Sequence, residues 1–258
     1  MDTLKELYHY REMIVSLVRK GLRGRYKGSV LGFLWTFINP LLQLVVYTIV
    51  FSNIMKSGIE KFYLFLFVAL IPWMFFSASV TGGASCIIAE GNLVKKVYFP
   101  RQVLPISYVT TAFVNMLLTF VIVLFALIVG GIGLNFGVLI YLPAVMLVEY
   151  LLALGIAMLT SALTVFFRDL EHILGIVTMA WMYLTPIMYE VDRIPEQYLT
   201  VFRLNPMTPI IMAYRDILYY KQTPKLSTLA QALTWGILIL LIGSFIFNIL
   251  QKYFAEEL

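Results

Sequence analysis

Charged residues are scarce in this chain of 258 residues. Charged residues make up 13% of the sequence, hydrophobic residues make up 61%, and the mean hydropathy is +0.88. A soluble domain averages about 25% charged residues, so this chain has too few to cover a surface that faces water. The composition therefore excludes a water-soluble globular protein and indicates an all-α integral membrane protein.

Cysteine, histidine and phosphate-binding motifs are also scarce. Cys86 is the single cysteine and the chain has two histidines, which excludes an intrachain disulfide and argues against a His/Cys metal site. No Gly-x-x-x-x-Gly-Lys-Ser/Thr sequence occurs, so ATP-driven work requires another subunit. We expect no catalytic residue, metal or cofactor in this chain. We also expect no nucleic-acid partner, because its basic flanks suit anionic lipid headgroups.

Long uncharged runs indicate where the chain crosses the bilayer. The runs that contain no Asp, Glu, Lys or Arg are 28–55, 62–89, 102–148 and 226–251. The third run would form a helix of roughly 70 Å at ~1.5 Å per residue, so it must turn, and the glycines of 130–133 mark that turn. The chain then crosses again over 138–167 and over 172–189. The sequence predicts six transmembrane helices within 30–254.

Lysine and arginine are concentrated on one side of these spans. Twelve of the nineteen lie in segments that share a side with the N-terminus, and five of the others lie in the long loop 190–225, where the positive-inside rule weakens. Because six spans return the chain to its starting side, we expect both termini to be cytoplasmic. The basic segment 1–29 and the long apolar run after it argue against a cleavable signal peptide.

The first 29 residues have their own pattern. The apolar residues at helical spacing within 3–20 are Leu7, Tyr10, Ile14, Leu17 and Val18. This pattern predicts an amphipathic helix, broken by Gly21 and Gly24, that lies in the cytoplasmic interface or packs on a soluble partner. The residues that follow it form the inner mouth of the first span: Arg23, Arg25, Tyr26 and Lys27. They either attract an anionic headgroup such as a pyrophosphate or serve as positive-inside anchors.

Two loops are longer than the ~2–8 residues that connect neighbouring helices in bundles. Loop 86–104 mixes apolar and basic residues and forms either a short docking helix or a surface turn. Loop 190–225 contains four prolines, and its apolar runs are too short to cross the membrane. It forms either re-entrant helices buried in protein or a small extracytoplasmic cap.

Polar and aromatic residues repeat at i+4 inside two of the spans. One set is Trp35, Asn39, Gln43 and Tyr47, and the other is Thr178, Trp181, Thr185 and Tyr189. Since polar groups are costly in lipid, these faces should turn toward protein or a water-filled path. Aromatic rings on such a path suit sugar rings, although Trp35 and Tyr189 also fit as interface anchors. Glu149, the one carboxylate within a span, is either functional or bonded to a neighbouring helix.

Three stretches of the chain carry a family resemblance. They are RYKGSVLGFLW over 25–35 with Asn39-Pro40, NLVKKVYFPR over 92–101, and LTPI over 184–187 with LNPM over 204–207 and Tyr214-Arg215. In this order they resemble the type-2 ABC exporter permeases, which export the polysaccharides and polyol phosphates of O-antigen, capsule and teichoic acid. The resemblance covers nearly the whole chain.

The resemblance implies a homodimer with a channel between its protomers and two copies of a cytoplasmic ATPase, which binds ATP and Mg. It implies that loop 86–104 is the coupling segment, whose candidate contacts are Glu90, Asn92, Lys95, Lys96, Tyr98 and Arg101. The outer loop would form gate helices, with Pro206, Pro209 and Arg215 as candidate residues. The candidate channel-lining residues are Trp35, Asn39, Gln43, Tyr47, Trp181 and Thr185.

The resemblance thus implies a permease subunit that exports lipid-linked polysaccharide across the cytoplasmic membrane, with the inner mouth receiving the lipid-linked pyrophosphate. Two alternatives remain open at this point. One is a permease for a drug or a free lipid, and the other is a passive channel that works without an ATPase. The coupling loop separates the passive channel from the two permeases, because a channel does not need it.

Overall fold

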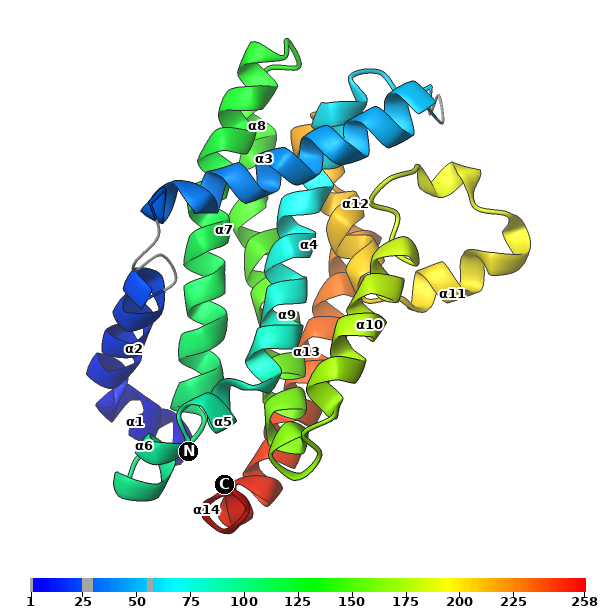
Figure 1. Ribbon diagram of the computed structural model, residues 1–258. Coiled ribbons are helices and arrows are strands. Elements are labelled where there is room, and N and C mark those ends of the chain that lie inside the picture. The colour runs from blue at the N-terminus through cyan, green and yellow to red at the C-terminus, as the bar shows by residue number, and fades with distance from the viewer. Residues whose placement is uncertain (1, 25–29, 55–57) are drawn as a thin grey trace.

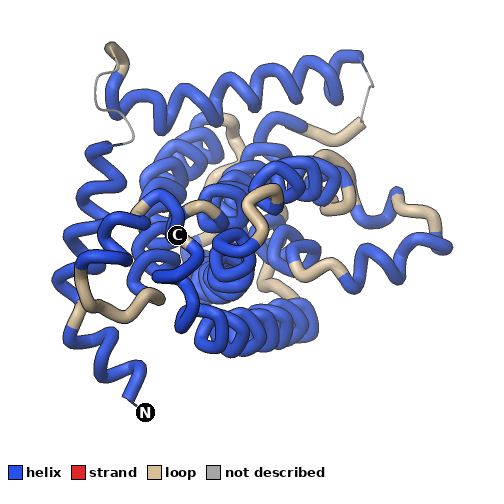
Figure 2. The backbone as a smooth tube through the Cα atoms, turned by 60° about the horizontal axis from the view of Figure 1, so that its bottom comes forward, coloured by secondary structure: helices blue, strands red, loops and turns tan. Residues whose placement is uncertain are grey.

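The protein is all-helical over the residues that the structure describes, which are 2–24, 30–54 and 58–258 of the computed structural model. Figure 2 shows helices joined by short loops, and no β-strand occurs in these ranges. Five helical stretches within them are long and apolar enough to cross a bilayer: Gly32–Phe51, Phe62–Ala84, Val103–Val129, Phe136–Phe166 and Leu226–Glu257. The described residues thus form an all-α integral membrane fold.

The long helices form a bundle around two central members. Its helices are α3 (Trp35–Thr48), α4 (Phe62–Ala84), α7 (Val103–Val129), α9 (Leu142–Phe166), α10 (Leu170–Tyr183) and α13 (Leu226–Leu250). Helices α4 and α9 are the most deeply buried, and α9 packs along both α4 and α13. Figure 1 shows α3 crossing α7 and α4 at a steep angle, whereas the other long helices run roughly side by side.

Glycines allow α9 and α13 to approach closely. A Cβ on Gly155 of α9 would lie 2.6 Å from the backbone of Leu240, and a Cβ on Gly243 of α13 would collide with the carbonyl oxygen of Gly155. Small residues permit such backbone contact between membrane helices, where dispersion contacts replace the hydrophobic effect as the source of stability. This contact fixes the two helices against each other.

The turn predicted inside the long run is confirmed. Gly131 and Gly133 both have φ of 74°, a left-handed conformation that glycine adopts without strain, and Gly131 lies just after Gly130, the residue that caps the end of α7. The short α8 (Phe136–Leu139) then leads back into α9.

The structure differs from the predicted six spans at 172–189. Helix α10 has 14 residues, about 21 Å at ~1.5 Å per residue, and ends at Tyr183. Pro186 has no backbone N–H and disfavours a helical conformation for the residue before it, so the helix ends before it has the length of a full span. Residues 184–190 continue the path without helical structure.

The N-terminal segment is amphipathic as predicted, but it is divided differently. Helices α1 (Asp2–His9) and α2 (Arg11–Gly24) meet at Tyr10, and α2 continues through Gly21, where the sequence predicted a break. Gly21 lies against α7, and a Cβ there would be 3.0 Å from Thr111 Cγ2. The glycine therefore serves close packing of α2 on α7, and the charged residues of α2 remain exposed.

The two termini lie at the same end of the bundle, beside the loop that carries α5 (Cys86–Ala89) and α6 (Gly91–Lys96) (Figure 1). The short C-terminal α14 (Phe254–Glu257) packs against α6 and α9. Phe254 is fully buried, with its ring in edge contact with that of Phe247. The C-terminus is therefore part of the packed fold.

Candidate functional site

The coupling segment is held in place by two buried anchors. Val94 of α6 and Phe99 after it are 2% and 1% exposed. Arg101 donates from Nη1 to the carbonyl oxygen of Phe99 (2.6 Å) and from Nη2 to that of Val94 (3.2 Å), and its guanidinium lies 5.3 Å from the centroid of the Phe99 ring. Arg101 thus ties the loop to its own anchors.

The other candidate coupling residues point outward. Asn92, Lys95, Lys96 and Tyr98 are all exposed, with Tyr98 at 79%. Because the apolar residues of α6 face the bundle, these polar side chains form a basic surface at the end that holds both termini. Such a surface fits a docking helix. It does not fit a loose turn, because the backbone of this segment is anchored by the buried side chains of Val94 and Phe99.

The N-terminal helices brace this segment. Lys20 of α2 forms an ion pair with Glu90 at 2.6 Å, and the Tyr10 hydroxyl donates to the carbonyl oxygen of Tyr98 at 3.3 Å. Lys20 is largely exposed, so the ion pair contributes only about 0–1 kcal/mol. Glu90, a predicted coupling contact, thus faces α2 and pairs with Lys20.

The broken end of α10 is tied to α12 (Met207–Leu218) by Asn205. Its Oδ1 accepts hydrogen bonds from Trp181 Nε1 and from the Met207 backbone N–H, both at 2.9 Å. Its Nδ2 donates to the Leu184 carbonyl oxygen and to the Thr185 hydroxyl, again at 2.9 Å. The carboxamide of Asn205 uses its full hydrogen-bonding capacity inside the protein, where an unpaired backbone group would be costly.

Arg215 of α12 satisfies the next carbonyls along the broken chain. It donates to the oxygens of Pro186 and Ile187 at 2.5 Å and to that of Tyr189 at 3.2 Å. The side chain is buried, and its guanidinium lies 3.6 Å from the centroid of the Phe65 ring. A cation over a desolvated ring is stabilised by about 2 kcal/mol. We name the group Trp181, Thr185, Asn205 and Arg215 the outer clamp.

The outer clamp changes the interpretation of three predicted site residues. Trp181 and Thr185, which the sequence predicted as channel-lining residues, contact Asn205, and the Trp181 ring meets Phe76 of α4 edge-on at 5.1 Å. Arg215, predicted at the outer gate, lies inside the protein. The motif residues of 184–187, 204–207 and 215 therefore meet at one place in the fold, where they replace the missing turns of helix.

Glu149 bonds to a neighbouring helix. It is fully buried in α9, and its Oε2 accepts a 2.6 Å hydrogen bond from the hydroxyl of Tyr214, which is also fully buried. Glu149 Oε1 has no hydrogen-bond partner among the described residues. The pair joins α9 to α12 next to the outer clamp.

The outer loop contains both of the forms that the sequence left open. Helix α12 is buried over most of its length among α4, α9 and α13 and is too short to span a bilayer, as the re-entrant alternative requires. Pro206 precedes this helix and Pro209 lies in its first turn, where a missing N–H is harmless. In contrast, α11 (Leu199–Leu204) belongs to an arm that projects from the bundle (Figure 1).

Tyr220 attaches the end of this re-entrant segment to the start of the arm. Its hydroxyl donates to Glu190 Oε1 at 3.2 Å. Burial raises the pKa of Tyr220 to about 12, and the charge of Glu190 adds to the rise, so the phenol stays protonated and remains a donor.

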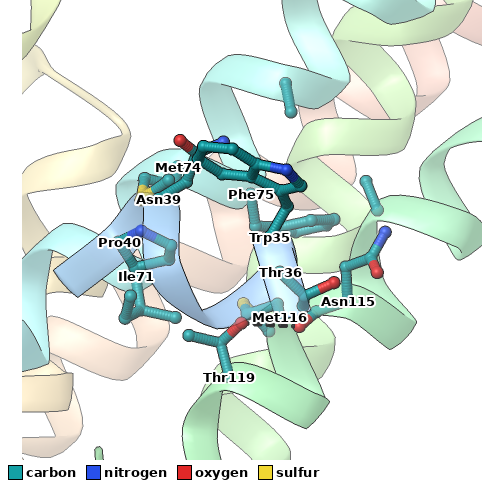
Figure 3. A pocket seen from close by; sticks show the side chains of 12 residues that line it. Trp35, Thr36, Asn39, Pro40, Ile71, Met74, Phe75, Asn115, Met116 and Thr119 are labelled. Atoms are coloured by element: carbon teal, nitrogen blue, oxygen red, sulfur yellow. Dashed lines mark hydrogen bonds between the residues drawn. The ribbon is translucent and has the colours of Figure 1, made fainter. Parts of the chain in front are cut away.

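A pocket of about 360 Å³ lies where α3 crosses α4 and α7 (Figure 3). Trp35 and Asn39 line it, together with Thr36 and Pro40 of the same helix. Gln43 and Tyr47 follow on α3, both half-buried, and are not among its lining residues. Of the four polar and aromatic residues predicted to share one face of α3, the first two therefore border a cavity within this chain.

The inner mouth is described in part. Arg23 is exposed near the end of α2, whereas Arg25, Tyr26 and Lys27 lie outside the described residues. Within the described ranges no cluster of three or more His, Cys, Asp or Glu side chains is positioned to hold a metal ion.

Sequence analysis missed Asn205, Tyr214 and Asn115 as site residues. Asn205 and Tyr214 lie within the quoted motifs but were given no role, because their partners are distant in sequence. Asn115 had a signal, since Thr111, Asn115 and Thr119 repeat at i+4 inside an apolar span. The i+4 spacing is the same as that of the two polar and aromatic sets identified on the other spans.

Comparisons with known proteins identify the family of this chain. The family model for the ABC-2 type transporter matches residues 12–219. The chain is 37% identical to the O-antigen export system permease protein RfbA of Myxococcus xanthus, over 99% of this chain and 98% of that protein. It is 33% identical to RfbA of Klebsiella pneumoniae (96% and 95% covered) and 24% identical to the polysialic acid transport protein KpsM of Escherichia coli (79% and 80% covered).

The family model spans the coupling segment, the outer clamp and all the long helices except α13. The match to RfbA of Myxococcus xanthus, over 99% of this chain, includes α13 as well. They exclude a passive channel, because the ABC-2 family consists of transporters that work with a partner ATPase. The protein is a multi-pass inner-membrane transport subunit without an enzymatic role of its own, and it belongs to the ABC-2 type transporter family.

Proposed function

We propose that this permease exports a lipid-linked polysaccharide of the O-antigen or capsule class across the cytoplasmic membrane. The observation that carries the proposal is the similarity to O-antigen export permeases over nearly the full length of both chains. Exported drugs or free lipids form the alternative substrate class, but no relative reported above is a drug or lipid exporter. The polysaccharide class is therefore favoured.

The working unit in this proposal is a homodimer with two copies of the ATPase. ATP and Mg bind the ATPase, and this chain supplies the contact through Asn92, Lys95, Lys96 and Tyr98. The anchored backbone and the exposed basic face of α6 support that role. With this face at the cytoplasmic side, both termini are cytoplasmic as well, because they lie at the same end of the bundle (Figure 1).

In the proposed reaction sequence the basic residues at the end of α2 and after it receive the anionic headgroup of the lipid carrier. Movement of the ATPase then shifts the helices through the coupling segment, and the glycan passes outward between protomers. The re-entrant α12 closes the outer side, where the outer clamp holds it to α10.

Affinity purification of the tagged chain from its native membranes in mild detergent tests this proposal. Mass spectrometry should find a P-loop ATPase at one copy per permease, and addition of the glycolipid fraction from the same cells should stimulate ATP hydrolysis. Stimulation by free phospholipid alone would replace the polysaccharide assignment with the lipid alternative. Absence of the ATPase would refute the coupling role of α6.

A further inference from the structure

The pocket between α3, α4 and α7 contains a buried amide without a partner. Asn115 lies near the middle of α7 and is 7% exposed. Neither its Oδ1 nor its Nδ2 has a hydrogen-bond partner within the described residues. Figure 3 shows Asn115 beside Trp35 and Thr36 in the wall of the pocket.

The side chains around Asn115 do not supply the missing hydrogen bonds. The Thr119 hydroxyl donates to the backbone oxygen of Asn115 at 2.9 Å, and Met116, Ile71 and Phe75 contribute apolar surface. A buried polar group without a partner costs about 1–3 kcal/mol, more than the fold gains from placing an asparagine there. A ligand that supplies both a donor and an acceptor would recover this free energy.

The chemistry of the lining narrows the class of ligand. Among the described residues no Asp, Glu, Lys or Arg lines the pocket, so a phosphate or another charged group would be desolvated there without a counter-charge from them. A carboxamide pairs well with two adjacent hydroxyls, since one can donate to Oδ1 while the other accepts from Nδ2. The indole of Trp35 adds a flat apolar surface of the kind that packs on the C–H face of a sugar ring.

The pocket can also be reached from outside. Asn39 lines it and is exposed, so the cavity extends to the surface of the protomer. Its volume of about 360 Å³ falls in the range of small-molecule sites, roughly 300–1,000 Å³. One ring, and not an extended oligosaccharide, is the appropriate occupant.

We propose that the pocket between α3, α4 and α7 binds a single neutral sugar ring and that the Asn115 carboxamide bonds two of its adjacent hydroxyls. The site lies within one protomer. The inference rests on the proposed function in one respect, that the ring belongs to the exported glycan.

Saturation-transfer NMR on the full chain in phosphatidylcholine nanodiscs tests the site. The probes are the methyl glycosides of mannose, galactose, glucose and rhamnose. Wild-type protein should transfer saturation to at least one of them. Asn115→Leu, which has similar volume, should weaken that binding at least ~10-fold, because two neutral hydrogen bonds are lost. Thr164→Val on α9 is the matched control, since Thr164 is buried outside the pocket and its hydroxyl is bonded to the backbone oxygen of Thr160, and it should bind as wild type does.

The thermal midpoint of the same samples separates binding from folding. Asn115→Leu should be at least as stable as wild type, because it removes an unpaired polar group. If it fails to fold, Asn115→Ala removes the same carboxamide without adding a branched side chain and gives the binding result. Glycoside binding that persists in the folded Asn115 variants would overturn the proposal, as would wild-type protein that binds none of the probes.

Export in cells separates this inference from the proposed function. In a strain that lacks the permease, the wild-type gene should restore surface glycan and the Asn115→Leu gene should restore less of it. Normal export by Asn115→Leu would overturn the link between the pocket and the glycan while leaving the function intact. Failure of the wild-type gene to restore any glycan would refute the proposed function, whatever the NMR shows.

Discussion

Replacing Asn205 tests how the broken α10 is stabilised. Asn205→Leu keeps the side-chain volume roughly constant but removes four hydrogen bonds, to Trp181, Leu184, Thr185 and Met207. Each contributes about 1 kcal/mol net, and the loss leaves the Trp181 and Met207 N–H groups without these acceptors inside the protein. We expect the free energy of unfolding to fall by about 3–5 kcal/mol, which corresponds to a drop of the thermal midpoint on the order of 10 °C.

The assay is thermal unfolding of purified protein in nanodiscs, followed by intrinsic tryptophan fluorescence. Asn92→Leu is the matched control, because Asn92 is exposed and its side chain makes no hydrogen bond within the described residues. Its unfolding free energy should stay within about 0.5 kcal/mol of wild type. If Asn205→Leu is no less stable than Asn92→Leu, the four hydrogen bonds do not stabilise the re-entrant segment and the reasoning is refuted.

Three further predictions concern other parts of the fold. The double change Lys95→Glu, Lys96→Glu should abolish most of the export and leave the thermal midpoint unchanged, since both side chains are exposed; normal surface glycan would argue against docking at α6. Gly243→Ala should destabilise the protein by about 1–3 kcal/mol through its collision with α9, whereas Gly175→Ala, which meets open space on α10, should be neutral or stabilising. Tyr214→Phe should cost about 1–3 kcal/mol, because it leaves both oxygens of Glu149 unpaired; an unchanged unfolding midpoint would show that the carboxylate needs no donor.

Local signals in the sequence predicted the features that depend on a few neighbouring residues. The glycines of 130–133 predicted the turn after α7, and the apolar spacing of the N-terminal segment predicted an amphipathic helix. Gly21 was misleading, because its low helix propensity is outweighed by the close packing against Thr111. Propensity describes an isolated helix, and here a tertiary contact decides.

The end of α10 shows where such prediction stops. Pro186 within 172–189 gave a signal that the helix would break, but hydropathy alone favoured a full span. The break is tolerated because Asn205 and Arg215 donate hydrogen bonds to the backbone carbonyls that lack a helical partner. Asn205 and Arg215 are distant from the break in sequence. Similarly, no pattern in the sequence shows that Trp181 faces Asn205, or that Asn115 lies unpaired beside Trp35.

The packing of α14 decides where a reporter can be attached to this permease. Phe254 is buried, and the side chain of Leu258 lies next to Gly91 at the start of α6, so this end of α14 is a neighbour of the basic surface. A fluorescent protein fused directly there would occlude the face on which the ATPase is expected to sit and would mimic a coupling defect. The exposed arm that contains α11 offers a better position for a short epitope, and labelled antibody applied to spheroplasts, from which the outer membrane has been removed, would then also establish the orientation of the chain.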